Sequence, residues 1–462
     1  MQRLVVALAL ALAPVTATAA PVLIEGMPHV EQRPDFCGEA CLSMAMKRLG
    51  HDVSQDAIFG LTGVDPALGR GAWTREMVVA AKALGFDIGP VWSTVRAEEP
   101  GDLDAAFGAL VADLERGVPS IVCTRFDARP NTTEHFRLVT GYDDRTDEVI
   151  THDPAIRKGA YLRMKRATFL SLWPLKYDPD AWTLVRLRLD PIDVRRPPKE
   201  AAPTAAALAQ HVRALREGLP PGFTVVVQAP FVVIGDEAPA TVRSRAEKTV
   251  GWAMQRLEAL FFDKQPSEIL NVWLFKDAAS YEHHARTLLG DVPGTPYGYY
   301  SPRLRALVMN IGTGGGTLVH EIVHPYMRAN YPSCPAWINE GLGSLFEQSA
   351  ERNGRIVGLT NWRLAGLQRA IRAGGVPTFR RLTSTSDSSF YGDDSGVHYA
   401  QARYLMLWLQ EQGLLERFVR GAMAARAQDP SGWRTLQLVL GEDDMAAFQR
   451  RWETWVLGLR FP

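Results

Sequence analysis

The chain has 462 residues and a balanced charge, with 51 basic and 51 acidic side chains. This length gives room for two or three domains, each with its own hydrophobic core. Because there is no net charge, the composition excludes a general electrostatic attraction to nucleic acid or to an anionic membrane surface, and we expect neither partner.

Residues 1–20 have the pattern of a secretory signal peptide. A basic residue stands at Arg3, an apolar run covers 4–15, and small residues precede a cut after Ala19 or Ala20. The apolar run is short for a bilayer span and is interrupted by a proline, and no later segment is apolar enough to cross a membrane. The sequence therefore predicts an exported protein, periplasmic or secreted, with no membrane span after cleavage.

Residues 22–191 are predicted to form a mixed α+β domain. Apolar residues recur at helical spacing in 34–50, 74–85 and 102–117, and each of these segments ends in a glycine suited to a helix C-cap. Short runs rich in β-branched and aromatic residues follow, namely PSIVCTRF, HFRLVTGYDD, EVITHDP and AWTLVRLRLD. Polar turns separate them, and they predict neighbouring strands.

Four cysteines are too few for a disulfide framework at this size. Cys37 stands at or just before the N-terminus of the first predicted helix. The free N–H groups and the dipole there favour a thiolate and lower the pKa of the thiol, which predicts a nucleophile. Cys41, one turn later, and Cys123, in a predicted buried strand, are expected to pack in the core.

A cysteine nucleophile also needs a base, a group that orients the base, and a donor for the oxyanion. His135 begins a predicted strand and Asp153 ends a neighbouring one, while Gln32 precedes Cys37 by five residues. These residues can serve as base, orienting group and oxyanion donor respectively. We therefore predict a catalytic set of Cys37, His135, Asp153 and Gln32.

The motifs around these residues, QRPDFCGEA, HFRLVTGYDD and HDP, resemble those of the C39-like papain-fold cysteine peptidases. The resemblance covers about residues 22–190 and implies a papain-like α+β fold with peptidase activity. The family usually has proline where this chain has Glu39, and a carboxylate there would oppose formation of the Cys37 thiolate. The alternative of an inactive domain that binds a substrate or a partner therefore stays open.

Residues 192–203, IDVRRPPKEAAP, are charged and proline-rich, so they predict a linker. Residues 204–462 form the second predicted domain. It opens with a helix over about 204–217, the strands FTVVVQ and FVVIGD, a long helix over 242–262 and the strand ILNVWLFK. Two strand-like runs in YGYYSPRLRALVMN then lead to the helix that contains HEIVH, and the chain beyond 361 is predicted to be mostly helical.

His320 and His324 lie four residues apart on this predicted helix and face the same way, which is the spacing at which two imidazoles bind one Zn²⁺. Glu321 then lies beside the metal, where a carboxylate can take a proton from bound water and pass it to a leaving amine. Glu340, in the frame WINEG, is the candidate for the third ligand. Three protein ligands leave one position open, which is typical of a catalytic zinc site.

The combination of HExxH with a following WxNEG resembles the gluzincin metallopeptidases, in particular the peptidase MA-like families. The likeness extends loosely over about 222–411 and implies a zincin-like α+β domain, a zinc cofactor and peptidase activity. The family's YAQ-like segment implies Tyr399 as the donor to the oxyanion, with Tyr391 and His398 as the other candidates.

Three positions near the zinc motif need separate interpretation. Pro325 directly follows the second histidine, so the helix is expected to kink or end there. Ser344 stands where thermolysin-like enzymes have an aspartate that orients a zinc-binding histidine; Glu347 is either its replacement or a solvated charge. Cys334, in the loop between the ligands, is expected to be structural, with an inhibitory approach to the metal as the alternative.

Together these patterns predict an exported two-domain peptidase that hydrolyses peptide or protein substrates by zinc-activated water and carries a second Cys-His-Asp site. The predicted architecture is a papain-like α+β domain followed by a zincin-like α+β domain with a mostly helical C-terminal part. In one alternative only the zinc site is catalytic and the first domain is a binding module. In the other, the protein is a non-enzymatic binding protein that contains zinc.

Overall fold

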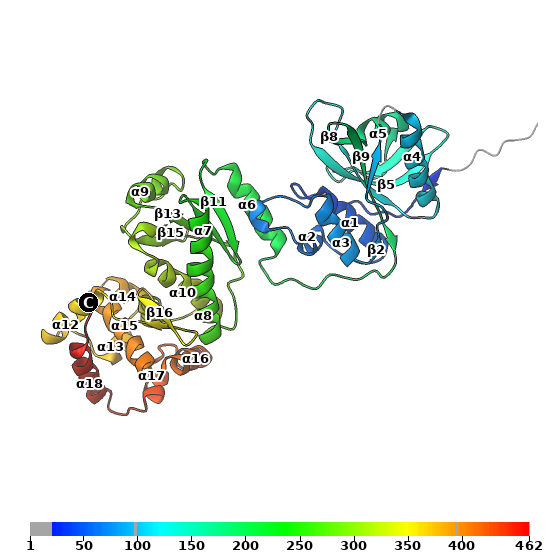
Figure 1. Ribbon diagram of the computed structural model, residues 1–462. Coiled ribbons are helices and arrows are strands. Elements are labelled where there is room, and N and C mark those ends of the chain that lie inside the picture. Colours follow the sequence, from blue (N-terminus) through cyan, green and yellow to red (C-terminus); the bar gives the residue numbers. More distant parts are fainter. Residues whose placement is uncertain (1–20, 97–98, 393–394, 462) are drawn as a thin grey trace, which may run out of the picture. The chain divides into compact units, whose positions relative to one another are not determined.

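The computed structural model describes residues 21–96, 99–392 and 395–461 (Figure 1). The predicted signal peptide lies outside the described residues. The chain divides into two compact units between Gln210 and His211, and each unit is described by itself. Among the described residues, no helix combines the length and the apolarity needed to cross a bilayer.

The division falls within helix α6 (Ala205–Glu217) and not in the predicted linker 192–203. Residues 192–203 contain no helix or strand, but their first residues lie against the first unit. The backbone N–H groups of Ile192 and Asp193 both donate to the Gly85 carbonyl oxygen. The start of this segment therefore belongs with the first unit, a contact that its polar composition did not indicate.

The first unit contains five α-helices in its described residues. The three predicted helices are present, although their ends differ by a few residues, and two short ones were not predicted. Ser54 caps the first of these two by accepting a hydrogen bond from the Ala57 N–H. The helices are α1 (Cys37–Arg48), α2 (Gln55–Thr62), α3 (Thr74–Ala83), α4 (Pro100–Glu115) and α5 (Arg166–Leu172).

The main sheet of this unit is antiparallel and has the order β3-β9-β4-β5-β6-β7, with β1 paired to β5 and β8 to β9. The four predicted strands, now β4, β5, β6 and β9, lie in this sheet as neighbours. The strands are β1 (Val22–Leu23), β3 (Trp92–Val95), β4 (Ser120–Arg125), β5 (Glu134–Asp143), β6 (Glu148–His152), β7 (Leu162–Lys165), β8 (Leu175–Asp178) and β9 (Ala181–Arg188). A separate pair joins β2 (Phe86–Asp87) to β10 (Asp190–Pro191).

Helices and sheet form two sides of the first unit. In Figure 1, α1, α2 and α3 lie together, and α4 and α5 lie beside the sheet that contains β5 and β9. The N-terminus of α1 is fixed by Phe36, which is fully buried and stacks on Phe59 with ring centroids 4.9 Å apart. Helix α1 packs against β5, so this contact brings the beginning of the helix to the strand that carries His135.

The second unit is built on a mixed five-stranded sheet of order β11-β12-β13-β15-β14. The three inner strands run parallel, and both edge strands run antiparallel to their neighbours. All five were predicted, whereas a hairpin of two further strands was not. The strands are β11 (Thr224–Gln228), β12 (Phe231–Gly235), β13 (Leu270–Phe275), β14 (Gly298–Ser301) and β15 (Ala306–Asn310), with the hairpin β16 (Ser349–Arg352) and β17 (Arg355–Gly358).

Helices make up most of the rest of this unit. The long helix predicted over 242–262 is α7 (Pro239–Arg245) followed directly by a π-helical segment (Ala246–Gly251) and α8 (Trp252–Leu260). Helix α9 (Ala278–Thr287) was not predicted. The others are α10 (Gly316–Asn330), α11 (Ala336–Leu345), α12 (Arg363–Arg372), α13 (Phe379–Thr383), α14 (Asp387–Gly392), α15 (Ser395–Glu411), α16 (Leu415–Ala425), α17 (Trp433–Leu440) and α18 (Met445–Gly458).

Helix α10 does not end at Pro325, which was one of the two outcomes expected there; it continues to Asn330. A proline removes the N–H that would bond the carbonyl four residues earlier. The cost is offset because Pro325, Tyr326 and Met327 are all buried in the core of the unit.

Glycines allow α10, α11 and α15 to approach closely. A Cβ on Gly316, the first residue of α10, would lie 2.0 Å from the carbonyl oxygen of Glu347. A Cβ on Gly341 would lie 3.2 Å from the Ala402 carbonyl oxygen, and one on Gly343 would lie 3.2 Å from the Nε2 atom of His320. The small residues that follow the predicted ligand Glu340 are therefore required by packing.

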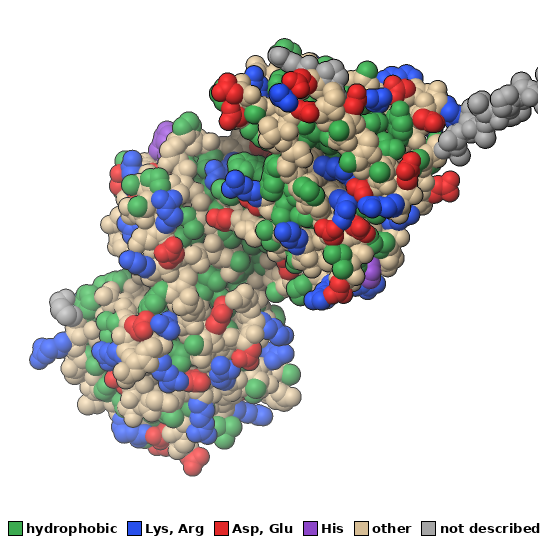
Figure 2. Space-filling model, turned by 45° about the vertical axis from the view of Figure 1, so that its right-hand side comes forward, with side chains coloured by type: hydrophobic (Ala, Val, Ile, Leu, Met, Phe, Trp, Pro, Cys, Tyr) green, Lys and Arg blue, Asp and Glu red, His purple; other side chains and the backbone are tan. Residues whose placement is uncertain are grey.

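On the face of the molecule shown in Figure 2, basic and acidic side chains are intermixed. The chain as a whole also carries equal numbers of basic and acidic side chains.

We expect Gly316→Ala to destabilise the second unit by about 1–3 kcal/mol, because the added methyl group must displace the backbone at Glu347. Urea unfolding, followed by hydrogen exchange of peptides from α10 and α11, measures this loss. Gly366→Ala, inside α12, is the matched control, since its Cβ would meet only the end of the Arg369 side chain at 3.9 Å. Equal stability of the two variants would contradict the close contact.

Candidate functional sites

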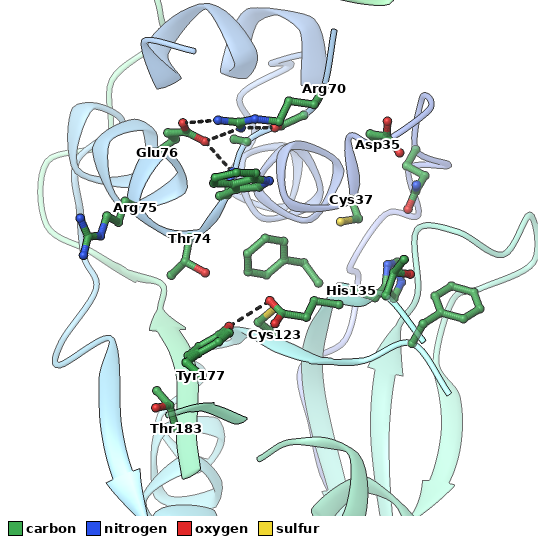
Figure 3. Close-up of a pocket in the computed structure, with 18 of the residues that line it drawn as sticks. Asp35, Cys37, Arg70, Thr74, Arg75, Glu76, Cys123, His135, Tyr177 and Thr183 are labelled. Carbon is green, nitrogen blue, oxygen red and sulfur yellow. Dashed lines mark hydrogen bonds and ion pairs between the residues drawn. The ribbon is translucent and has the colours of Figure 1, made fainter. Parts of the chain in front are cut away.

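A cavity of about 1180 Å³ lies in the first unit between the helices and the sheet (Figure 3). Its lining includes Cys37 at the start of α1, His135 near the start of β5, and Gln32 from the preceding loop. The structure thus brings three of the four predicted catalytic residues of this domain to one cavity. Asp153, the fourth, follows β6 directly and contacts His135.

The contact between His135 and Asp153 is a buried hydrogen bond. His135 Nε2 lies 2.7 Å from Asp153 Oδ1, and both side chains are about 95 % shielded from solvent. Burial alone would raise the pKa of Asp153, but the hydrogen bond and charge of His135, together with Arg137, hold that pKa below its usual value. Because Nε2 is engaged, Nδ1 is the ring nitrogen that remains for a reacting thiol.

Arg137 is a site residue that the sequence analysis missed. Its Nε donates to the second oxygen of Asp153 at 2.9 Å, and its Nη2 donates to the Phe126 carbonyl oxygen at 2.8 Å. Strand alternation could have revealed it, since residues 135 and 137 point to the same face of β5. Arg137 keeps Asp153 ionised and fixes the end of the neighbouring strand.

The predicted low pKa of Cys37 is wrong for this structure. The side chain is half-buried, and burial raises the pKa of the thiol to about 11. The backbone N–H of Phe136 works in the opposite direction, and the charge of Glu39 adds to the rise. Desolvation therefore outweighs the effect of the helix N-terminus, so the thiol is protonated at rest and must pass its proton to a base before it can attack.

Glu39 is fully buried and joins α1 to a wall of the cavity. Its Oε1 accepts a hydrogen bond from the Ala72 N–H at 2.7 Å. Burial raises the pKa of this carboxyl to about 7, and the Ala72 N–H limits the rise. The same wall is tied to the backbone before Cys37, since a Cβ on Gly71 would lie 1.9 Å from the Asp35 carbonyl oxygen.

Gln32 is held next to the loop that carries Asp153. Its backbone N–H donates to the Pro154 carbonyl oxygen at 2.9 Å. Its Oε1 is buried and has no hydrogen-bond partner among the described residues. The amide is thus placed on the cavity, as a donor to a developing oxyanion has to be.

The other two cysteines of this unit are buried, as predicted. Cys41 contacts the Phe136 carbonyl oxygen, with 3.8 Å from Sγ to oxygen. Cys123 lies on the cavity wall, where its Sγ is 3.7 Å from Glu134 Oε2 (Figure 3). Burial, and for Cys123 the charge of Glu134, raise the pKa of both thiols, so neither is an activated nucleophile.

A second site lies in the other unit, where α10 and α11 meet. The Nε2 atoms of His320 and His324 lie 3.2 and 3.8 Å from the same oxygen, Oε2 of Glu340. The three potential ligand atoms all lie within 4.8 Å of one another. Glu340 Oε2 is buried and has no hydrogen-bond partner among the described residues. Two imidazole nitrogens and one carboxylate oxygen form a donor set that fits Zn²⁺.

The outer nitrogens of both imidazoles lie close to a polar side chain, by a hydrogen bond for His324 and by an ion-pair contact for His320. His320 Nδ1 lies 3.2 Å from Glu347 Oε1, and His324 Nδ1 lies 3.0 Å from Asn339 Oδ1. The contact of Glu347 with a histidine is therefore confirmed, whereas the role of Asn339 was missed although it stands within WINEG. Ser344 does not take part, because its Oγ donates to the Gly341 carbonyl oxygen.

Glu347 itself accepts hydrogen bonds from two residues that follow β17 in the chain. Arg363 donates to both of its oxygens, at 2.8 and 3.0 Å, and Asn361 Nδ2 donates to Oε2 at 3.0 Å. Neither residue was predicted, because both are remote from the motif in sequence. Together they fix the carboxylate that orients His320.

The electrostatics of this site are dominated by buried carboxylates. Burial lowers the pKa of His320, but Glu340 and Glu347 more than reverse this effect and bring it to about 10. In turn, burial raises the pKa of both carboxyls, but their contacts, with His320 first, bring it to about 2. The site therefore favours a positive charge beside its carboxylates.

The three candidates for the donor to the oxyanion make different contacts near this site. The Tyr391 hydroxyl donates to Glu340 Oε1 at 2.7 Å. Tyr399, favoured by the sequence analysis, lies beside Tyr391 with ring centroids 6.2 Å apart, and burial followed by the charge of Glu340 raises its pKa. His398 turns toward Phe390, with Nδ1 3.3 Å from the Phe390 carbonyl oxygen. Both tyrosines thus lie near the Glu340 carboxylate: Tyr391 donates the hydrogen bond given above, and a hydrogen bond to Glu340 also contributes to the raised pKa of Tyr399.

Two predicted residues remain, namely Glu321 as the proton acceptor and Cys334 in the loop between the histidines and Glu340. Glu321 is half-buried on α10 next to His320, and its charge contributes to the raised pKa of that histidine. Cys334 is half-buried, and its Sγ lies 3.6 Å from the Pro335 carbonyl oxygen. Within the described residues, the group able to hold a metal consists of His320, His324 and Glu340 and does not include this cysteine.

Comparisons with known proteins concern the first unit. Residues 24–178 match the model of the Peptidase_C39 like family, which confirms an N-terminal C39-like domain. Among solved structures, the chain is similar to the peptidase domain of Streptococcus ComA, a bi-functional ABC transporter involved in a quorum sensing pathway. The identity is 22 %, the TM-score is 0.25, and the match covers 36 % of this chain and 99 % of that one. No curated protein matches the chain.

Replacement of Glu39 by glutamine should make Cys37 more reactive. Glu39 is ionised well below the pH at which Cys37 titrates, so removal of its charge lowers the pKa of the thiol. Glutamine can still accept the hydrogen bond from Ala72. At about pH 8 we expect the rate of iodoacetamide modification of Cys37 to rise by up to about tenfold, which corresponds to one pKa unit. Glu31→Gln, on an exposed residue, is the control, and equal rates in all three proteins would contradict this role of Glu39.

Proposed function

We propose that the protein is an exported peptidase that hydrolyses peptide bonds at a zinc site formed by His320, His324 and Glu340. The observation that carries this proposal is the convergence of both Nε2 atoms on one buried oxygen of Glu340. The polar groups beside both outer nitrogens, Glu347 and Asn339, support it, because zinc-bound imidazoles commonly have a carboxylate or a carbonyl at their other nitrogen.

His320, His324 and Glu340 would hold the zinc ion, which would supply a Lewis acid for water and for the substrate carbonyl. Glu321 follows His320 directly on α10, so its carboxylate can accept a proton at the site and return it to the leaving amine. The hydroxyl of Tyr399, on which the charge of Glu340 acts, is the candidate donor that could stabilise negative charge on the carbonyl oxygen, since the hydroxyl of Tyr391 donates to Glu340. Three protein ligands leave room for water, which favours a catalytic over a structural metal.

Charge balance gives independent support for a bound cation. Arg363 neutralises Glu347, which leaves Glu340 buried with a neutral hydroxyl on one oxygen. A buried carboxylate is costly unless a positive partner compensates it. Protonated His320 or a divalent metal ion can provide that charge, and the geometry of the two Nε2 atoms suits the metal.

We also propose that the C39-like domain is a second peptidase site, in which His135 activates Cys37 and Asp153 orients His135. The His135–Asp153 hydrogen bond and the shared cavity of Cys37, His135 and Gln32 support this proposal. His135 Nδ1 accepts the thiol proton, the sulfur adds to the substrate carbonyl, and the protonated imidazole returns the proton to the leaving amine. Water then hydrolyses the acyl-enzyme.

Aromatic side chains on the cavity suit a peptide substrate. Trp73, Trp92 and Tyr177 line the cavity, and between 47 % and 67 % of each residue's surface is exposed. They offer apolar contact area beside the thiol for the side chains of an extended chain. The protonated thiol and the nearby Glu39 favour the alternative in which this domain binds such a chain without cleaving it.

Two substitutions in the full-length mature chain separate these functions. We expect Glu321→Gln to lower the chelator-sensitive cleavage of an unfolded protein by about 10²–10⁴-fold, the usual contribution of a general base. Cys37→Ala should remove the cleavage that is sensitive to a thiol blocker. Glu268→Gln, on a largely exposed side chain, is the control for the change of charge.

The pattern of losses decides between the alternatives. If only Glu321→Gln reduces cleavage, the C39-like domain is a binding module. If neither substitution reduces cleavage of the unfolded protein, both peptidase proposals are wrong.

Glu347→Gln should weaken zinc binding by about 10–100-fold, because it loosens the orientation of His320. Competition with a chromophoric chelator measures the affinity. Glu351→Gln is a matched control four residues along the chain, where the side chain contacts Trp252 and Arg256 and does not contact the site. An unchanged affinity in Glu347→Gln would contradict the positioning role. Absence of zinc binding by the unmodified protein would contradict the site itself.

A further inference from the structure

The two oxygens of Glu340 have different environments. Oε2 faces the Nε2 atoms of His320 and His324 and has no hydrogen-bond partner among the described residues. Oε1 accepts the hydroxyl of Tyr391 at 2.7 Å. The carboxylate therefore presents one oxygen to the candidate metal position while the other is held by a neutral donor.

This asymmetry matters because a carboxylate can bind a metal through one oxygen or through two. With two, Glu340 would occupy an additional position around the metal and reduce the room for water and substrate. A hydrogen bond to Oε1 competes with that second metal contact. We propose that Tyr391 is a positioning residue that restricts Glu340 to a single ligand oxygen and thereby keeps a coordination position open. This inference rests on the proposed zinc function.

The surroundings of Tyr391 suit this role. Its ring packs edge-on against Phe390 at 5.5 Å between centroids and lies 6.2 Å from the ring of Tyr399. The residue is 47 % exposed, whereas Glu340 is only 5 % exposed. Tyr391 is therefore open to solvent over about half of its surface, whereas the carboxylate that its hydroxyl contacts is buried.

Other groups near the site are already engaged. Both side-chain hydrogen bonds of Arg363 go to Glu347, and the Asn339 side chain is hydrogen-bonded to His324. Glu340 Oε1 accepts its hydrogen bond from Tyr391, a residue 51 positions further along the chain. A helix that is remote in sequence thus controls how the ligand carboxylate can bind.

Cobalt substitution tests this proposal in the full-length protein. Four-coordinate Co²⁺ absorbs visible light much more strongly than five- or six-coordinate Co²⁺, so the spectrum reports the number of ligands. We expect the unmodified protein to give the intense spectrum and Tyr391→Phe to give a clearly weaker one, because Oε1 becomes free to bind the metal. The hydroxyl projects from a half-exposed ring, so Tyr391→Phe should keep its thermal unfolding midpoint.

Tyr331→Phe is the matched control, because it removes a buried hydroxyl that has no partner among the described residues. It should keep the intense spectrum. In the zinc-loaded protein, Tyr391→Phe should lower kcat/KM for a peptide by about 10–100-fold, as loss of an outer partner of a metal ligand typically does.

The outcomes separate the existence of the metal site from the role of Tyr391. If the unmodified protein binds no Co²⁺ or Zn²⁺, the proposed function and this inference are both wrong. If it binds Co²⁺ and Tyr391→Phe gives the same spectrum as the unmodified protein, the metal site stands and the role of Tyr391 is wrong. A weaker spectrum in Tyr331→Phe as well would also overturn the inference, since the effect would not depend on the contact with Glu340.

Discussion

Two buried carboxylates on α11 and the turn after it face the imidazole of His320 on α10. Glu340 meets one ring nitrogen and Glu347 the other, both at 3.2 Å. This arrangement requires the two helices to pack very closely, which glycines at 316 and 343 allow. It also concentrates negative charge in the interior, where Arg363 compensates one carboxylate and a bound cation can compensate the other. The proposed metal site follows from this packing and this charge.

A different constraint governs the thiol site, where desolvation works against the chemistry. Burial raises the pKa of Cys37 and of Glu39 next to it, so the nucleophile is neutral at rest. The catalysis that we propose would then depend on His135 as the base, with Asp153 kept ionised by His135 and by Arg137. Glu39 also fastens a wall of the cavity through Ala72. The same residue that opposes a thiolate therefore supports the shape of the site.

Local spacing made the central residues of both sites predictable. HExxH places two imidazoles on one helix face, and the cysteine motifs place their residues at the ends of recognisable elements. The supporting residues were not predictable in this way. Arg363, Asn361 and Tyr391 reach the proposed metal site only through tertiary packing. The pKa of Cys37 was predicted in the wrong direction because the degree of burial cannot be read from a helix N-terminus alone.

The central claim is that His320, His324 and Glu340 bind zinc and leave a position open. X-ray absorption at the zinc edge, measured on the zinc-loaded protein, tests it most directly. The account predicts four nitrogen or oxygen neighbours at about 2.0–2.2 Å, two of them with the outer scattering of imidazole, and no sulfur at about 2.3 Å. A sulfur neighbour, or a zinc without imidazole, would contradict it.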